Sequence, residues 1–270
     1  MPTPKHKADV ENLTSSDFEV KERKPKILFF DIETSALTVR TWRTYQADAI
    51  KVINTWQMLS WSAKWQNGKH ITKCLADYDG YDPATNNDKP LVIELWHLLS
   101  EADVVIGHNL DKFDVKKMNT RAVIHDMKPP EPYKTVDTLK LARAKFAFHS
   151  NKLDALGELL GVGRKAQTGG YDLWERCIAG DLKAWRMMKR YNRQDVILLE
   201  AVYDRLLGWA TTHPHIGILK DHGESCRNCG SKDLQRRGHA VTLTGQSLRF
   251  HCQNCGAWMR GKFVKRTDIR

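Results

Sequence analysis

Residues 27–34 read Ile-Leu-Phe-Phe-Asp-Ile-Glu-Thr, a short apolar run that ends in two acidic residues. Side chains two residues apart on a strand project from the same face, so Asp31 and Glu33 share one face of a strand predicted over residues 26–33. A solvated strand end would explain a single pair of this kind. A functional carboxylate pair is the alternative, and the rest of the sequence bears on the choice.

A second acidic position follows another predicted strand, over residues 103–106. Gly107-His108-Asn109 comes directly after it, and Phe113-Asp114 falls in the first turn of a helix predicted from about residue 111. The helix dipole favours a carboxylate in a first turn, so helix capping by Asp111 or Asp114 is an equally good explanation.

A long amphipathic helix, predicted over residues 181–209 with Asp181 as its N-cap, contains the last acidic candidate. Tyr191 and Asp195 lie on its apolar stripe, which otherwise consists of Trp185, Met188, Leu199, Val202 and Leu206. A buried carboxylate without a partner costs several kcal/mol, so Asp195 needs a metal, a base or a hydrogen-bond network. An arginine or backbone partner remains open.

The remaining pattern predicts an α/β fold, a mixed sheet flanked by helices. Residues 53–65 and 70–78 are strand-like, and Asn67-Gly68 between them is a strong hairpin signal, so the sheet opens as an antiparallel meander. Helical and strand patterns then alternate. We expect a strand over residues 134–136, a glycine-containing loop over 161–170, and helices over 90–100, 139–145 and 151–160.

Together these segments place four acidic residues, Asp31, Glu33, Asp114 and Asp195, on elements that can converge at one end of the sheet. Clustered carboxylates repel one another unless cations neutralise them. Oxygen ligands suit Mg²⁺ or Mn²⁺, and two such ions can activate water and stabilise a leaving oxygen at phosphorus. The sequence therefore predicts a two-metal site.

Three short motifs resemble the exonuclease motifs of the DEDD superfamily, in the same order. They are Phe30-Asp31-Ile32-Glu33-Thr34, Gly107-His108-Asn109 with Phe113-Asp114, and Tyr191-Asn192-Arg193-Gln194-Asp195. The Tyr-x-x-x-Asp form is that of the DEDDy branch. Residues 136–143 and 152–156 also resemble connecting segments of ribonuclease H-like 3′-5′ exonucleases, including phage-borne ones. The resemblance covers about residues 26–208.

The resemblance implies a ribonuclease H-like fold, two divalent ions and stepwise release of nucleoside monophosphates from a 3′ end. By matching position, Asp31 would bridge both ions, and Glu33 and Asp195 would hold the ion that carries the attacking water. Asp114 would support the second ion, and Tyr191 would orient the water.

Other residues receive secondary roles. Asn109 and Phe113 would contact or shape the substrate site, and Asp137 is equally well explained as a helix N-cap. Arg164 and Lys165 belong either to a solvated loop or to a phosphate contact. Trp42 and three further tryptophans of the first strands are expected mostly in the core or half-buried in the sheet.

Two C-x-x-C pairs near the C-terminus stand apart from that resemblance. Cys226 and Cys229 are followed, 22 residues after Cys229, by Cys252 and Cys255, with a hairpin signal at Thr244-Gly245 between the pairs. This spacing predicts a zinc ribbon with one structural Zn²⁺. Two metal-free reduced pairs are a poor alternative, because so short a segment buries little apolar area.

The basic residues are concentrated in the same region. Residues 211–270 include 11 basic and four acidic residues, a net charge of +7 out of +11 for the whole chain. Arg236, Arg237, Arg249 and Lys262 alternate with aromatic residues and would suit a nucleic-acid backbone with stacked bases. A docking surface for a replication or repair protein is the alternative.

Length and composition limit the classes of protein. The 270 residues, 41% hydrophobic and 28% charged, indicate a folded protein of one large or two modest domains. No apolar run approaches the roughly 20 residues that span a bilayer, and the N-terminus lacks the apolar segment of a secretory signal. Unpaired Cys74 and Cys177 suit a reducing compartment. We therefore expect no membrane contact and a cytoplasmic location, in the host if the gene is phage-borne.

The sequence thus predicts three parts: a flexible arm over residues 1–25, a ribonuclease H-like exonuclease domain over 26–210, and a zinc ribbon over 218–270. The predicted activity is 3′-5′ exonucleolytic cleavage of single-stranded nucleic acid, with DNA favoured over RNA. Two rivals remain: a nucleic-acid-binding replication scaffold with a vestigial nuclease core, and a structure-specific endonuclease on the same fold.

Overall fold

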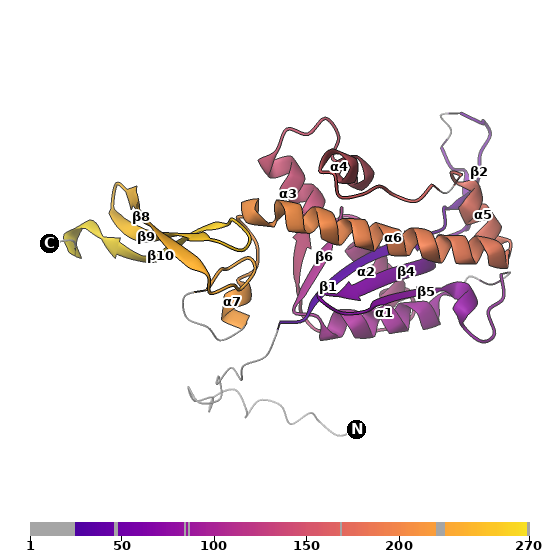
Figure 1. Ribbon diagram of the computed structural model, residues 1–270. Coiled ribbons are helices and arrows are strands. Elements are labelled where there is room, and N and C mark those ends of the chain that lie inside the picture. Colours follow the sequence, from indigo (N-terminus) through magenta and orange to yellow (C-terminus); the bar gives the residue numbers. More distant parts are fainter. Residues whose placement is uncertain are drawn as a thin grey trace, which may run out of the picture.

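The computed structural model describes residues 25–45, 48–83, 85, 87–167, 169–219 and 225–268. The predicted N-terminal arm lies outside these residues except for Pro25. An α/β unit comes first, and a three-stranded sheet lies at the end of the longest helix, away from α5 (Figure 1). We call residues 225–268 the C-terminal module.

The α/β unit is built on a five-stranded mixed sheet of order β5-β4-β1-β6-β7, as predicted. The central strand β1 (Ile27–Thr34) pairs antiparallel with β4 (Met58–Trp65) and parallel with β6 (Val104–Gly107). The outer strands are β5 (His70–Cys74) and β7 (Lys134–Asp137). The acidic end of β1 therefore lies in the middle of the sheet.

Local signals explain the meander and the long helix. Asn67 adopts φ 61° and the Gly68 N–H donates to the Trp65 carbonyl at 2.8 Å, which closes the predicted hairpin between β4 and β5. The long helix is α6 (Leu182–Leu206), and the Asp181 side chain caps it by accepting from the N–H groups of Lys183 and Ala184. The other helices of this unit are α1 (Lys89–Glu101), α2 (Asp114–Ile124), α3 (Thr138–Lys145), α4 (Leu153–Leu159) and α5 (Asp172–Ile178).

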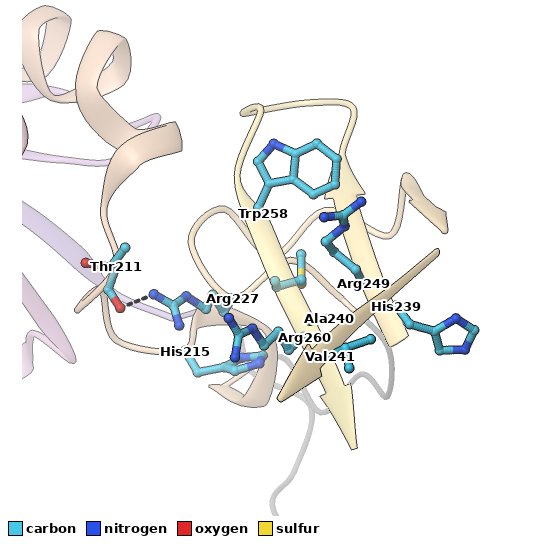
Figure 2. Close-up of a pocket in the computed structure, with 10 residues that line it drawn as sticks. Thr211, His215, Arg227, His239, Ala240, Val241, Arg249, Trp258 and Arg260 are labelled. Atoms are coloured by element: carbon cyan, nitrogen blue, oxygen red, sulfur yellow. Dashed lines mark hydrogen bonds between the residues drawn. The ribbon is translucent and has the colours of Figure 1, made fainter. Parts of the chain in front are cut away.

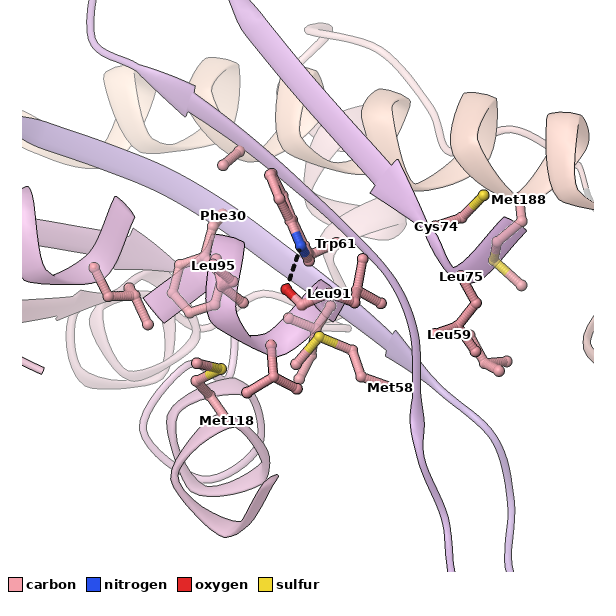
Figure 3. Close-up of a cluster of buried hydrophobic side chains, with 14 of the residues drawn as sticks. Phe30, Met58, Leu59, Trp61, Cys74, Leu75, Leu91, Leu95, Met118 and Met188 are labelled. Atoms are coloured by element: carbon pink, nitrogen blue, oxygen red, sulfur yellow. Dashed lines mark hydrogen bonds between the residues drawn. The ribbon is translucent and has the colours of Figure 1, made fainter. Parts of the chain in front are cut away.

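Strand β1 is buried on both faces, which explains its continuous apolar run. Phe30 packs in one cluster with Trp61, whose indole donates to the Leu91 carbonyl at 3.0 Å (Figure 3). Phe29 faces the other cluster and meets Tyr203 of α6 edge-on, with ring centres 5.3 Å apart. Since side chains alternate along a strand, the carboxylates of Asp31 and Glu33 continue the Phe29 face, which α6 covers.

Several predicted boundaries were wrong. Residues 53–65 are not one strand: β3 (Lys51–Asn54) pairs with β2 (Thr38–Arg40) in a separate hairpin, and β4 begins only at Met58. The buried Asp88 carboxylate accepts from the Met58 N–H at 2.7 Å and fixes that start.

Three further elements also differ from the prediction. The end of the expected strand over residues 70–78 is a 3₁₀ turn, η2 (Leu75–Asp77), and the helix expected from residue 111 begins at Asp114. The expected helix over 181–209 ends at Leu206 and continues as the 3₁₀ turn η3 (Leu207–Trp209). Helix α5 was not predicted, because seven residues give little periodicity.

The C-terminal module is a sheet of order β10-β9-β8, made of β8 (Leu234–Thr242), β9 (Gly245–Cys252) and β10 (Trp258–Lys265), followed by η4 (Arg266–Asp268). Its first cysteine loop packs on the end of α6, where the Asn228 amide donates to the carbonyls of Leu207 and Ala210 at 2.8 and 3.0 Å. The short helix α7 (Ile216–Leu219) precedes the module, and the Ile216 N–H donates to the Arg227 carbonyl. No helix within the described residues is long and apolar enough to cross a membrane.

Candidate active site

Three of the four predicted acidic residues form a tight group between the central strand and the long helix. One carboxylate oxygen from each of Asp31, Glu33 and Asp195 lies within 4.8 Å of the others. Asp195 is fully buried, whereas Asp31 and Glu33 are partly exposed. The spacing of two residues on β1 and the position of Asp195 on the buried face of α6 bring these side chains together.

The fourth acidic residue, Asp114, lies beside this group but outside it. It begins α2, is 2% exposed, and accepts a hydrogen bond from the Ile32 N–H at 3.1 Å. That bond ties the first turn of α2 to the strand between the two β1 acids. Asp114 therefore has a positional role in addition to its charge.

Burial and mutual repulsion favour the neutral form of all four carboxyl groups. Burial raises the pKa of Glu33 to about 8; Asp195 adds to this shift, whereas Lys165 and a hydrogen bond from Trp174 oppose it. Burial likewise raises the pKa of Asp114 to about 7. The pKa of Asp31 is raised well above its usual value by burial and then by the charges of Asp114 and Glu33.

Lys165 supplies a positive charge inside the group. Its Nζ lies 2.5 Å from Asp195 Oδ2 and 3.2 Å from the Tyr191 hydroxyl. Burial lowers the pKa of Lys165, but the negative charge of Asp195 outweighs it and the net shift is upward, so the ammonium stays charged. The sequence left Lys165 between a solvated loop and a phosphate contact, and the structure places it against the carboxylates.

The loop that carries Lys165 approaches two helices closely. The Lys165 N–H donates to the Asp154 carboxylate of α4 at 2.6 Å. Gly157 allows this approach, because a Cβ there would lie 2.6 Å from the Gly163 carbonyl oxygen and 2.5 Å from Leu198 Cδ1. The glycines that predicted a flexible loop thus permit close packing.

Asn192 is a second residue that sequence reasoning did not single out. Its amide nitrogen donates to Asp31 Oδ2 at 2.7 Å, and its amide oxygen accepts from the Ser60 hydroxyl at 3.1 Å. Asn192 is fully buried and therefore orients the Asp31 carboxylate. The available signal was its position on the same helix stripe, one turn after Met188.

Tyr191 lies at the edge of the group and is partly exposed. Burial and the charge of Asp195 raise its pKa, so the phenol stays protonated. Trp174 of α5 meets its ring edge-on, with centres 5.8 Å apart. The unpredicted helix α5 therefore supports both Tyr191 and, through the Trp174 hydrogen bond, Glu33.

Asn109 and Phe113 lie on the second motif, away from the three grouped carboxylates. Asn109 adopts φ 64°, and its N–H donates to the Asp137 carboxylate at 3.0 Å. Asp137 also caps α3, so its N-cap role is present in the structure. The Phe113 side chain is 36% exposed and is available at the surface.

The acidic group fits a divalent cation. Asp195 Oδ1 is buried and has no hydrogen-bond partner among the described residues, which leaves an oxygen lone pair oriented for another ligand. All other donors of the group are carboxylate oxygens, the type that Mg²⁺ and Mn²⁺ prefer.

The four cysteines of the C-terminal module also converge. Their sulfurs lie within 4.8 Å of one another, with 3.5 Å between Cys226 and Cys255 and 3.6 Å between Cys229 and Cys252. All four are free thiols. Zn–S bonds of about 2.3 Å place tetrahedral sulfurs about 3.8 Å apart, so this arrangement fits one zinc ion.

A hollow of about 980 Å³ lies beside the strands of the C-terminal module (Figure 2). Of the basic residues predicted to contact nucleic acid, Arg249 lines it. Arg236, Arg237 and Lys262 are exposed elsewhere on β8 and β10. The residues that sequence reasoning missed are Arg227 and Arg260, which line the same hollow beside Trp258.

The chain belongs to the RNase H superfamily, whose profile matches residues 28–207. Among solved structures it resembles the family B DNA polymerase from the hyperthermophilic archaeon Pyrobaculum calidifontis, with a TM-score of 0.51 and 18% identity. The match covers 73% of this chain and 26% of the polymerase chain, so it shows a shared fold over a fraction of that protein. A comparison with curated protein sequences found no match. The superfamily and the fold support a nucleic-acid nuclease in general terms.

Proposed function

We propose that this chain is a metal-dependent 3′-5′ exonuclease of the DEDDy type that releases nucleoside monophosphates from single-stranded DNA, with RNA as the alternative polymer. The observation that supports this most strongly is the convergence of Asp31, Glu33 and Asp195 from β1 and α6, with Asp114 adjoining. Tyr191 lies one helical turn before Asp195. The RNase H superfamily match is consistent with this assignment.

In this proposal the carboxylates of Asp31, Glu33 and Asp195 hold two Mg²⁺ or Mn²⁺ ions, with Asp114 as the fourth acidic ligand. The ions supply charge neutralisation and Lewis acidity at the phosphodiester when bound. Asn192 keeps the Asp31 carboxylate oriented. The protonated Tyr191 hydroxyl orients the attacking water.

The exposed residues of the second motif border this centre and would contact the terminal nucleotide. Phe113 offers a ring for a base, and Asn109 offers an amide for a sugar or base edge. Neither residue touches the carboxylate group, so both are assigned to substrate binding.

The C-terminal module is proposed to be a zinc ribbon that holds the nucleic acid. Arg249 and Arg260 are direct partners across β9 and β10, and none of the residues lining the hollow is acidic. Like charges directly opposite each other are destabilising, and a bound phosphate would offset this repulsion. The Arg249 guanidinium also lies 5.1 Å from the Trp258 ring centre, which suits a base stacked beside a phosphate.

The remaining parts of the proposal concern organisation and context. We propose three parts with boundaries near residues 1–25, 26–210 and 218–270, a cytoplasmic location, and a phage-like exonuclease relationship. Docking of a replication or repair protein on the C-terminal module is the alternative use of that surface.

One experiment tests the activity. Oligonucleotides of DNA and of RNA, labelled at the 5′ or the 3′ end, are incubated with the full chain and Mg²⁺, and the products are resolved by length. We expect a descending ladder from 5′-labelled DNA and immediate release of a labelled mononucleotide from 3′-labelled DNA. Cleavage of a circular single strand would instead indicate an endonuclease, and absence of any metal-dependent cleavage would favour the scaffold.

A further inference from the structure

The hairpin over residues 35–57, which includes β2 and β3, exposes an unusual amount of apolar surface. Trp42 is 86% exposed and Tyr45 is 85% exposed, whereas the sequence placed most of these tryptophans in the core or half-buried. Leu37, Ile50, Val52 and Ile53 are also exposed. Contiguous exposed apolar surface of this kind commonly marks a binding site.

The base of the hairpin is fixed beside the carboxylate group. It leaves the sheet directly after Thr34, the last residue of β1, and returns at Met58, the first residue of β4. Ser35 and Gln57 close it with two hydrogen bonds of 3.0 Å, from Ser35 N–H to the Gln57 carbonyl and from Gln57 N–H to the Ser35 hydroxyl. The Tyr171 hydroxyl bonds the Ala36 backbone, so the hairpin also lies against the start of α5 (Figure 1).

Polar and aromatic groups connect the carboxylate group to this hairpin. Lys117 of α2 donates to the Thr34 hydroxyl at 3.1 Å, and its ammonium lies 3.9 Å from the Trp56 ring centre and 5.2 Å from that of Phe113. A cation, a hydroxyl and two rings therefore lie between the active centre and the hairpin. These are groups that contact phosphates and bases.

The charge of the hairpin selects the kind of partner. Residues 35–57 include Arg40, Arg43 and Lys51 against a single acid, Asp48. All three basic side chains are exposed, and none forms an ion pair with a described residue. An exposed surface that combines unpaired cations with aromatic rings suits a polyanion with planar bases.

We propose that the β2–β3 hairpin binds the single-stranded nucleic acid upstream of the 3′ end, with unpaired bases stacked on Trp42 and Tyr45 and phosphates contacted by Arg40, Arg43 and Lys51. The inference rests on the proposed function and adds a second strand contact. Figure 1 places the hairpin at the end of α6 near α5, and the C-terminal module at the other end. The strand would thus be held on both sides of the catalytic centre.

Fluorescence anisotropy with the full chain tests the proposal, in EDTA so that the strand stays intact. The probes are an oligothymidylate of about 16 nucleotides and a strand of the same length whose upstream sugars carry no bases. Trp42→Leu combined with Tyr45→Leu should weaken binding of the oligothymidylate by at least about fivefold, because stacking on each ring is lost. Binding of the abasic strand should change much less, since its phosphates remain.

Matched variants separate stacking from general apolar contact. Trp42→Phe combined with Tyr45→Phe keeps both rings and should restore most of the affinity. Val52→Thr alters the 51%-exposed Val52 of the same hairpin without touching a ring and should bind like wild type. Because Trp42 and Tyr45 are exposed, thermal unfolding should be unchanged in every variant.

Two results would overturn the inference: unaltered affinity of the double leucine variant for oligothymidylate, or equal losses for the normal and the abasic strand. Equal weakening by Val52→Thr would point to an apolar protein partner and would also overturn it. These failures are distinct from failure of the proposed function, which would appear as wild-type chain that does not degrade DNA from the 3′ end.

Discussion

Lys165 offers a direct test of the electrostatics of the candidate active site. The variant Lys165→Met keeps the length of the side chain and removes its charge, leaving Asp31, Glu33 and Asp195 without the ammonium that lies 2.5 Å from Asp195 Oδ2. Removing one partner of a buried ion pair costs about 3–5 kcal/mol. The Asp195 side chain is fully buried but that of Lys165 is 31% exposed, so we expect about 2–4 kcal/mol at pH 8.

The loss should depend on pH in a defined direction. The folded state holds Glu33 with a pKa of about 8 instead of 4.5, so it binds more protons than the unfolded chain between these values. Stability therefore falls as pH rises through this window. Without Lys165 the pKa of Glu33 rises further, so the variant should be close to wild type at pH 5 and most destabilised above pH 8.

Thermal unfolding in EDTA measures this effect. For a domain of this size, about 3 kcal/mol corresponds to a decrease in Tm of roughly 6–12 °C. Addition of Mn²⁺ should raise the Tm of Lys165→Met more than that of wild type, since the cation replaces the missing positive charge. Lys165→Arg, which keeps the charge, should lie between the two.

Arg164→Met is the matched control, because Arg164 is the neighbouring residue of the same loop and pairs with Glu158 at the surface. It should leave Tm almost unchanged. If Lys165→Met and wild type unfold at the same temperature in EDTA at pH 8, Lys165 does not neutralise the carboxylates and the electrostatic reasoning is wrong.

Three further outcomes are expected. Asp31→Asn and Asp195→Asn should each retain less than about a tenth of the wild-type cleavage rate while still binding DNA, and a higher rate would argue against the metal assignment. Tyr191→Phe should lower kcat by ~10²-fold with the Mg²⁺ titration midpoint unchanged, because it loses only water positioning; a midpoint shifted as far as in Asp195→Asn would contradict this role. Cys226→Ser should release zinc, unfold the C-terminal module and flatten the salt dependence of single-strand affinity by about 0.7 in log–log slope per lost phosphate contact, and an unchanged slope would favour protein docking.

Much of the α/β fold could be predicted because its signals are local. The continuous apolar run of β1 reflects burial on both faces, the Asn67-Gly68 turn supplies a positive φ, and Asp181 caps α6 as its position indicated. The same periodicities placed Asp31, Glu33 and Asp195 on buried faces. Even cysteine convergence followed from spacing, because two C-x-x-C loops joined by a hairpin can reach one ion.

The parts that sequence did not predict depend on contacts between distant segments. Asn192 meets Asp31 across 161 positions of the chain, and Lys165 meets Asp195 across 30, by way of a loop without periodicity. Trp174 belongs to a helix too short to show a pattern, and the exposure of Trp42 depends on a hairpin leaving the sheet. Residue spacing determined which carboxylates could share a face. Only the tertiary structure decided which amide, ammonium and indole would surround them, because those choices follow from packing between segments that have no fixed distance along the sequence.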